Sequence, residues 1–249
     1  IGFIVTVDLY NWGRKRVRKE ERRPHLTLHT RIVLVSTASL LVLGTVLTLG
    51  LEYDHTLKDL NFWEKLNASF FQSVTARTAG YATIPQGELG DATKLVTIIL
   101  MFIGASPSST GGGIKTTTFV VLVATVVSIS RGRDETVINK RRVDKSVVYR
   151  AMTIVAMAFL VIAITSGVIM VTTPPEVSAI DAVYEAVSAF GTVGLTTGLT
   201  PDLSIVAKIL VMLTMFIGRV GPISLVLALT MKHSGGPGKI LPEGKVIVG

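Results

Sequence analysis

Residues 77–85 of the chain read RTAGYATIP, and residues 191–201 read GTVGLTTGLTP. Both stretches are polar and contain glycine. Yet each follows a short run typical of an apolar helix, NASFFQSVTA before the first and YEAVSAF before the second. Because the same placement occurs twice, we expect the fold to be organised around these two stretches.

The composition favours a membrane protein. Hydrophobic residues make up 49% of the chain and charged residues only 17%, below the roughly 25% of soluble domains. Residues 32–51 and 151–173 contain no charge, and runs of this length cross about 30 Å of hydrocarbon. Two longer apolar stretches, 92–130 and 203–231, are interrupted by glycines, prolines and single cations. We predict an all-α polytopic membrane protein rather than a soluble protein with buried helices.

The positive charge is concentrated in two segments. Residues 14–31 hold eight Lys and Arg and residues 131–150 hold seven, whereas 52–67 holds two and 174–181 none. By the positive-inside rule the two basic segments are cytoplasmic and the two acidic ones external. We therefore expect a multi-pass protein of the plasma membrane with a cytoplasmic C-terminus. A pI near 9.8 also occurs in nucleic-acid-binding proteins, but basic clusters beside membrane spans argue against a nucleic-acid partner.

The two halves of the chain resemble each other at an offset of 114 residues. Met101-Phe102-Ile103-Gly104 then coincides with Met215-Phe216-Ile217-Gly218, in phase with the two Thr-x-Gly stretches. Such self-similarity indicates a duplicated unit. Each unit reads as a spanning helix, an acidic outer segment, a short helix, a Thr-x-Gly stretch and a second spanning helix. Both units start inside, so we predict parallel tandem repeats rather than the inverted repeats of many carriers.

The short helices, about Phe62–Ala76 and Asp181–Phe190, cannot span a membrane. They must enter from outside and return, which is tolerated only where the backbone lines a cavity or is buried in protein. Their C-terminal ends favour a cation, and the following carbonyls can replace its hydration water, as in potassium filters. A plain glycine turn is the simpler alternative for either stretch alone. The expected filter residues, with potassium held by the carbonyls of the glycines, are Thr78, Ala79, Gly80, Thr192, Val193 and Gly194.

Four segments together resemble one transporter family. They are SVTARTAGYATI, MFIGASPSSTGGGIKTTTF, SAFGTVGLTTGLTP and MFIGRVGP. They are similar to the third and fourth repeats of the membrane subunit of Ktr-type potassium transporters, in the superfamily that also includes Trk and the plant HKT transporters. The resemblance covers nearly the whole chain, and the first two repeats of that pattern are missing from these 249 residues.

The resemblance implies four helix–pore loop–helix repeats around one pore, so this chain would supply half of a filter. It also implies partners: membrane lipid, a second copy in a homodimer, and a cytoplasmic regulatory ring that binds the nucleotide. We expect no covalently bound cofactor; potassium is the transported ion, and a dependence on sodium is left open.

The apolar stretch 92–130 contains GASPSSTGGGIKTTT at 104–118. Because glycine and proline interrupt helices, we expect a break in the helix there. A surface loop is the simpler interpretation, but the flanking charge-free residues favour a break inside the membrane. A phosphate-binding loop needs glycine directly before the lysine, and Ile114 at that position argues against one. The resemblance implies an intramembrane gating loop. Candidate gate residues are Gly111, Gly112, Gly113, Lys115 and Arg219.

A cation within a span is costly and by default functional. This singles out Arg219 as a gate candidate, although an arginine that reaches the interface is the alternative.

Two other charged residues are expected to support the filter. Arg77 directly precedes the first filter stretch. We expect it to pair with an acid or with pore-loop carbonyls, and Glu185 is the candidate acid.

The chain thus divides into five segments. They are a helix tail with a basic linker (1–30), the first unit with its broken helix (31–130), a cytoplasmic linker (131–146), the second unit (147–231) and a cytoplasmic tail (232–249). A secondary solute carrier with broken helices is the alternative function. An enzyme is not expected, because no paired acid and base or metal cluster is present in the sequence.

Overall fold

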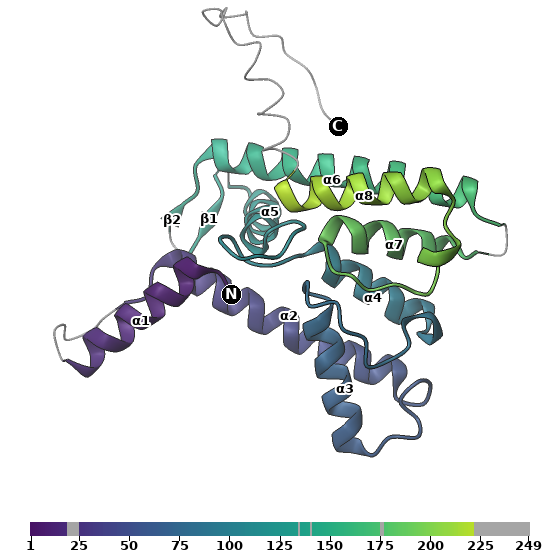
Figure 1. Ribbon diagram of the computed structural model, residues 1–249. Coiled ribbons are helices and arrows are strands. Elements are labelled where there is room, and N and C mark those ends of the chain that lie inside the picture. The colour runs from purple at the N-terminus through teal and green to yellow at the C-terminus, as the bar shows by residue number, and fades with distance from the viewer. Residues whose placement is uncertain (19–24, 134, 140, 175–176, 222–249) are drawn as a thin grey trace, which may run out of the picture.

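The computed structural model describes residues 1–18, 25–133, 135–139, 141–174 and 177–221 (Figure 1). It is mostly helical, as predicted. The helices are α1 (Phe3–Val17), α2 (Leu28–Glu52), α3 (Phe62–Thr75), α4 (Asp91–Phe102), α5 (Thr116–Ser130), α6 (Lys145–Thr172), α7 (Ala179–Gly191) and α8 (Ile205–Val220). Single 3-10 turns lie at Gln86–Glu88 and Thr200–Asp202, and a short antiparallel hairpin joins β1 (Val137–Ile138) to β2 (Arg141–Arg142).

Two of the described helices, α2 and α6, are long and apolar enough to cross a membrane. At about 1.5 Å per residue, their 25 and 28 residues exceed the hydrocarbon thickness. Each begins at a side-chain cap: Thr27 accepts a hydrogen bond from the Thr30 amide, and Asp144 from the Ser146 amide. Large apolar side chains stay exposed along both helices, for example Val42 on α2 and Leu160 on α6, as expected of faces in contact with lipid.

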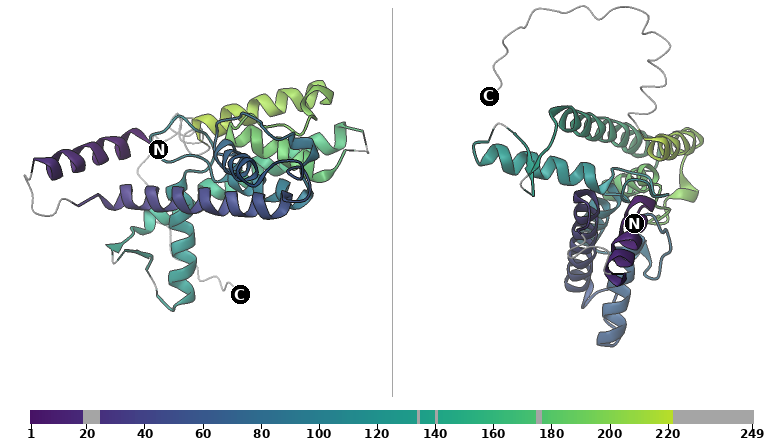
Figure 2. Two further views of the ribbon diagram at one scale, coloured as in Figure 1. Left: turned by 90° about the horizontal axis from the view of Figure 1, so that it is seen from below. Right: turned by 90° about the vertical axis from the view of Figure 1, so that its left-hand side faces the viewer.

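The same order of a long helix, a short helix and a further helix occurs twice along the chain. The helix α2 packs on α3 and α4, and α6 packs on α7 and α8 (Figures 1 and 2). Contacts between α4 and α7 join the two groups. That the two groups of helices are parallel repeats around one pore stays a prediction.

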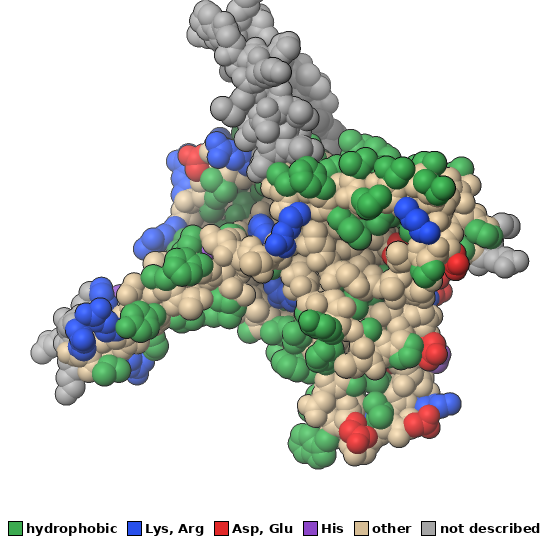
Figure 3. Space-filling model, in the orientation of Figure 1, with side chains coloured by type: hydrophobic (Ala, Val, Ile, Leu, Met, Phe, Trp, Pro, Cys, Tyr) green, Lys and Arg blue, Asp and Glu red, His purple; other side chains and the backbone are tan. Residues whose placement is uncertain are grey.

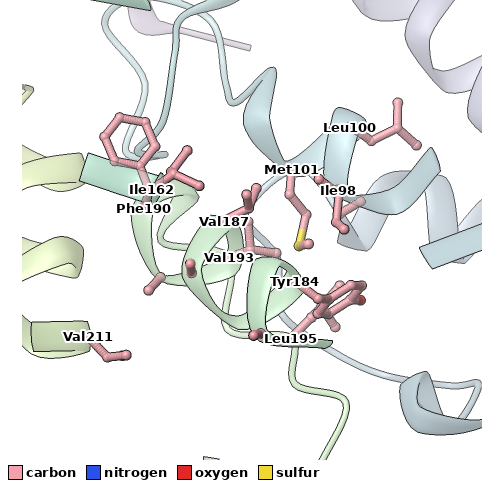
Figure 4. Close-up of a cluster of buried hydrophobic side chains, with 14 of the residues drawn as sticks. Ile98, Leu100, Met101, Ile162, Tyr184, Val187, Phe190, Val193, Leu195 and Val211 are labelled. Carbon is pink, nitrogen blue, oxygen red and sulfur yellow. The ribbon is translucent and has the colours of Figure 1, made fainter. Parts of the chain in front are cut away.

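The helix α7 is the centre of the core. Its side chains Tyr184 and Phe190 are fully buried, and they lie among residues of α4, α6 and α8 (Figure 4). Met101 of α4 points toward the same cluster (Figure 4). A short helix buried on all sides holds its C-terminal end in a fixed place, and that end leads into the second Thr-x-Gly stretch.

The break expected in the apolar stretch 92–130 is present and separates two helices. The helix α4 ends at Phe102 and α5 begins at Thr116. The helix α5 is seen end-on in Figure 1 while α2 and α6 lie in the plane, so it leaves the layer of the other helices (Figure 2). The connection 131–146, expected as a plain linker, contains the hairpin of β1 and β2.

Charges separate along the molecule in the way the sequence predicts. Lysines and arginines gather around the C-terminal part of α1 and around the β1–β2 hairpin, and acidic side chains gather near α3 and the start of α7 (Figure 3). The expected tail at 232–249, and the part of the last apolar stretch beyond Gly221, lie outside the described residues.

Candidate functional site

The two Thr-x-Gly stretches lie side by side. The first follows the C-terminal end of α3 and the second follows that of α7. A methyl group placed on Gly80 would come within 2.3 Å of the Val193 carbonyl oxygen, and one on Gly194 would lie 3.7 Å from the Gly80 Cα. Stretches more than a hundred residues apart in sequence are therefore in direct backbone contact, and both helix ends bring their partial negative charge to this point.

Matching positions in the two stretches share an unusual backbone conformation. Thr78 and Thr192 have φ of 71° and 51°, and Gly80 and Gly194 have φ of 77° and 91°. Positive φ is strained for a β-branched residue such as threonine, and strain of this kind concentrates at functional sites. Glycine adopts it without that cost, which explains the residue at the third position of both stretches.

The carbonyl after each glycine is fixed by a hydroxyl of the preceding short helix. Thr75 Oγ1 donates to the Tyr81 carbonyl oxygen at 2.6 Å, and Ser188 Oγ donates to the Leu195 carbonyl oxygen at 2.6 Å. Tyr81 and Leu195 are equivalent at the 114-residue offset. The two stretches are thus stabilised by the same kind of contact.

A buried polar cluster lies behind the stretches. The Gln72 and Gln86 side-chain amides bind each other at 2.6 and 3.1 Å, and the Tyr184 hydroxyl donates to Gln86 Oε1 at 2.8 Å. All three side chains are buried. Because buried hydrogen-bonded networks are rigid when satisfied, this cluster couples α3, the segment after the first stretch, and α7.

The glycine-rich loop that connects α4 to α5 lies directly against both threonines. The Gly112 amide donates to Thr192 Oγ1 at 3.0 Å, and a methyl group on Gly111 would come within 2.6 Å of Thr78 Oγ1. The two ends of the loop are paired, since the Ile114 amide donates to the Phe102 carbonyl at 3.3 Å. The loop is therefore closed on itself, with its tip at the two stretches.

Three cationic side chains hold this loop by its carbonyls. Arg77 Nη2 donates to the Gly104 carbonyl at 3.3 Å, and Lys115 Nζ donates to the Gly111 carbonyl at 2.5 Å. Arg219, from the end of α8, donates to the Thr110 carbonyl. The expected gate residues are thus brought together in space. A further anchor comes from α1, where the Phe3 amide donates to the Ser108 carbonyl at 3.1 Å.

The expected pair between Arg77 and Glu185 is wrong. Arg77 donates to the Gly104 carbonyl, which lies on the loop between α4 and α5 and not on the pore-loop backbone expected as the other partner. The Glu185 carboxylate instead accepts hydrogen bonds from the hydroxyls of Thr196 and, at 3.0 Å, Thr200. Both threonines lie within the second stretch, after Gly194, so this buried carboxylate takes its hydrogen bonds from nearby residues. Arg77 donates to a carbonyl at the α4 end of the loop.

One interhelical ion pair was not anticipated from the sequence. Lys94 Nζ of α4 lies 2.8 Å from Asp181 Oδ1, in the first turn of α7. The equivalent lysine at the 114-residue offset, Lys208, donates to the Pro201 carbonyl at 2.9 Å. The repeated lysine in the sequence was the available signal, but the partner could be found only with the packing of α4 on α7.

A family model described as TrkH, cation transport protein, matches residues 1–236. The Ktr system potassium uptake protein B of Bacillus subtilis is 36% identical, and the potassium/sodium uptake protein NtpJ of Enterococcus hirae is 38% identical. Each match covers 100% of this chain and 54% of the relative, so the chain spans about half the length of these relatives.

The fold is also similar to a solved structure. The crystal structure of the potassium transporter TrkH from Vibrio parahaemolyticus superposes with a TM-score of 0.67 at 20% identity. The superposition covers 93% of this chain and 49% of that one. At this identity the likeness describes the fold alone.

Proposed function

Because the chain belongs to the TrkH family of cation transport proteins, we propose that it supplies part of a pore that conducts potassium across the plasma membrane. In this proposal the carbonyls of the two Thr-x-Gly stretches bind the dehydrated ion. The observation that carries it is the contact between the stretches, where Gly80 meets Val193 and matching residues share positive φ. Two relatives named as potassium uptake proteins are consistent with this cargo.

The loop between α4 and α5 is the proposed gate. Its tip contacts Thr78 and Thr192, so it lies where an ion leaving the two stretches would have to pass. Lys115 and Arg219 hold it there through carbonyls of the loop itself. The positive charges of Lys115 and Arg219 at this position also repel a passing cation. In this proposal the pore opens when the loop and these two side chains move away.

The rest of the proposal concerns the assembly. Two stretches form half of a fourfold filter, so the remaining half must come from further repeats. We propose that the transporter is a homodimer and that a cytoplasmic ring, which binds the nucleotide, regulates it. Sodium is the second cargo to test, because the Enterococcus hirae relative is named for both ions.

The test is uptake by the intact transporter. It is expressed, with its cytoplasmic regulatory partner, in bacteria that lack their own potassium uptake. We expect growth at limiting potassium and uptake of rubidium that excess sodium does not abolish. Membrane-inserted protein that supports neither, or that carries small organic solutes coupled to an ion gradient instead, would favour the secondary-carrier alternative.

A further inference from the structure

A groove lies between α2 and α5, away from the two Thr-x-Gly stretches. It encloses about 550 Å³, within the roughly 300–1,000 Å³ of typical ligand sites. Its walls are mainly apolar. We call it the α2–α5 groove, and its principal lining residues are Ser36, Leu40, Leu43, Phe119, Val123 and Val127.

Among the described residues that line this groove, the charged ones lie at one end. Arg131, which caps α5, and Arg133 line it there, together with Asn139 of the hairpin turn. Asn139 also lines an adjoining recess of about 320 Å³. We call this space the headgroup recess. Its lining includes the two arginines Arg31 and Arg141, together with His25.

The wall at the charged end is held by side-chain contacts. Thr125 Oγ1 of α5 and Thr136 Oγ1 lie 2.9 Å apart, and the Val137 amide donates to Ser128 Oγ at 3.2 Å. The hairpin is therefore fixed on α5, so that the arginines and the apolar walls keep their relative places.

The arginines at this end are available for an external anion. In the described part of the chain, Glu135 is paired with Arg142 at 2.9 Å, and no carboxylate there pairs with Arg131, Arg133 or Arg141. An apolar groove that ends in arginines without a carboxylate partner among the described residues is complementary to a molecule with an anionic head and a hydrocarbon chain.

The position of the groove selects its occupant. The charged end belongs to the basic segment 131–150, which the positive-inside rule places at the cytoplasmic face. That leaflet is enriched in anionic lipids, and basic pockets between membrane helices on that side bind their headgroups. Beside the groove, α2 and α5 carry further exposed apolar side chains, for example Val35 on α2 and Val126 on α5.

We propose that the α2–α5 groove is a binding site for an anionic phospholipid of the cytoplasmic leaflet. The phosphate lies between the arginines of the groove mouth and those of the headgroup recess, and one acyl chain lies along the groove. Because α5 begins at the end of the loop that carries Lys115, a lipid bound there holds the helix from which that loop extends.

The test uses the intact, delipidated transporter titrated with phosphatidylglycerol or phosphatidylcholine, with binding followed by native mass spectrometry. We expect retention of phosphatidylglycerol and little retention of phosphatidylcholine. The double variant Arg133→Gln, Arg141→Gln should weaken phosphatidylglycerol binding about tenfold or more, because each basic residue near the surface contributes about a factor of five. The control Arg14→Gln, Arg150→Gln removes the same charge elsewhere on the basic side and should bind normally.

A matched pair of tryptophan variants tests whether an acyl chain lies in the groove. Ala124→Trp fills the groove, whereas Val126→Trp places the same side chain on α5 outside its lining; only the first should weaken binding. Equal binding of both lipids, or unaltered binding by the arginine variant, would overturn the proposal. So would displacement of the lipid by inorganic phosphate at matching affinity, or conversion of a dimer to monomers by Ala124→Trp, since a second copy would then be the occupant.

Discussion

Gly80 and Val193, which are 113 positions apart in the sequence, are in backbone contact, with 2.3 Å between a methyl group placed on Gly80 and the Val193 carbonyl oxygen. No side chain fits between the two stretches at this point. Any residue other than glycine at position 80 must move the Val193 carbonyl or its own backbone. Under the proposed function that carbonyl lines the path of the ion.

Replacing Gly80 by serine should therefore lower the preference for potassium over sodium. The new side chain both meets the Val193 carbonyl and occupies a φ of 77°, which costs an L-residue about 1–2 kcal/mol. We expect roughly a tenfold loss of preference, measured by rubidium uptake in competition with sodium. Gly194→Ser should act in the same direction but less strongly, because its nearest neighbour is 3.7 Å away.

A matched control for these variants is Gly167→Ala on α6. Nothing lies within 4 Å of the added methyl group, so protein level and ion preference should stay as in the parent protein. If Gly80→Ser also left the ion preference unchanged in well-folded protein, the assignment of this stretch to the filter would be wrong.

Replacing Arg219 by alanine should raise ion flux. The substitution removes the α8 anchor on the Thr110 carbonyl and one positive charge that acts on the charge of Lys115. Loss of an interaction worth about 1.4 kcal/mol shifts a closed-to-open equilibrium tenfold. Rubidium uptake should increase about tenfold even without the regulatory partner, while ion preference changes less.

The control on the same helix is Lys208→Ala. Lys208 binds the Pro201 carbonyl at the other end of α8, so its removal should leave the loop closed and the flux unchanged. Parental flux in a well-folded Arg219→Ala protein would make the loop a connector rather than a gate.

The pair between Lys94 and Asp181 should stabilise the packing of α4 on α7. Both side chains are largely buried, with exposed fractions of 8% and 22%. Lys94→Met leaves the carboxylate without its partner and should cost about 2 kcal/mol, or roughly 4–8 °C in Tm. Lys94→Met combined with Asp181→Asn should recover most of that loss, measured by thermal unfolding in detergent. Additive losses would show that the two residues act independently.

Two glycines of α2 should respond oppositely to alanine. A methyl group on Gly44 would lie 2.3 Å from Ser73 Oγ and 2.8 Å from Leu100 Cδ1, whereas one on Gly50 meets nothing within 4 Å. Gly44→Ala should therefore destabilise the contact with α3 and α4 by about 1–3 kcal/mol. Gly50→Ala should stabilise the helix by about 0.5–1 kcal/mol. A similar Tm for both variants would contradict the close approach at Gly44.

Much of the fold follows from the sequence because hydrophobic length and charge act locally. Charge-free runs define α2 and α6, and the break between Phe102 and Thr116 follows from consecutive glycines and a proline. The Thr-x-Gly stretches were identified by their repetition, although the sequence alone does not show that they touch.

What the sequence could not provide depends on packing. The direction of α5 and the hairpin of β1 and β2 depend on contacts such as Thr125 with Thr136, which no periodicity encodes. The acid predicted as the partner of Arg77 is wrong. Every residue has a backbone carbonyl, so the sequence does not indicate which one accepts a hydrogen bond, whereas a carboxylate such as Glu185 is visible as a candidate. The clusters of Gln86 with Tyr184 and of Lys94 with Asp181 each join residues more than 80 positions apart.

In the proposed function the two stretches bind a dehydrated potassium ion with backbone carbonyls. Crystals of the intact transporter grown with thallium, an anomalous scatterer that substitutes for potassium, test it directly. We expect anomalous density within coordination distance of the carbonyls around Gly80 and Gly194, and its loss on replacement by sodium alone. Well-ordered stretches with thallium bound elsewhere and none at these carbonyls would contradict it.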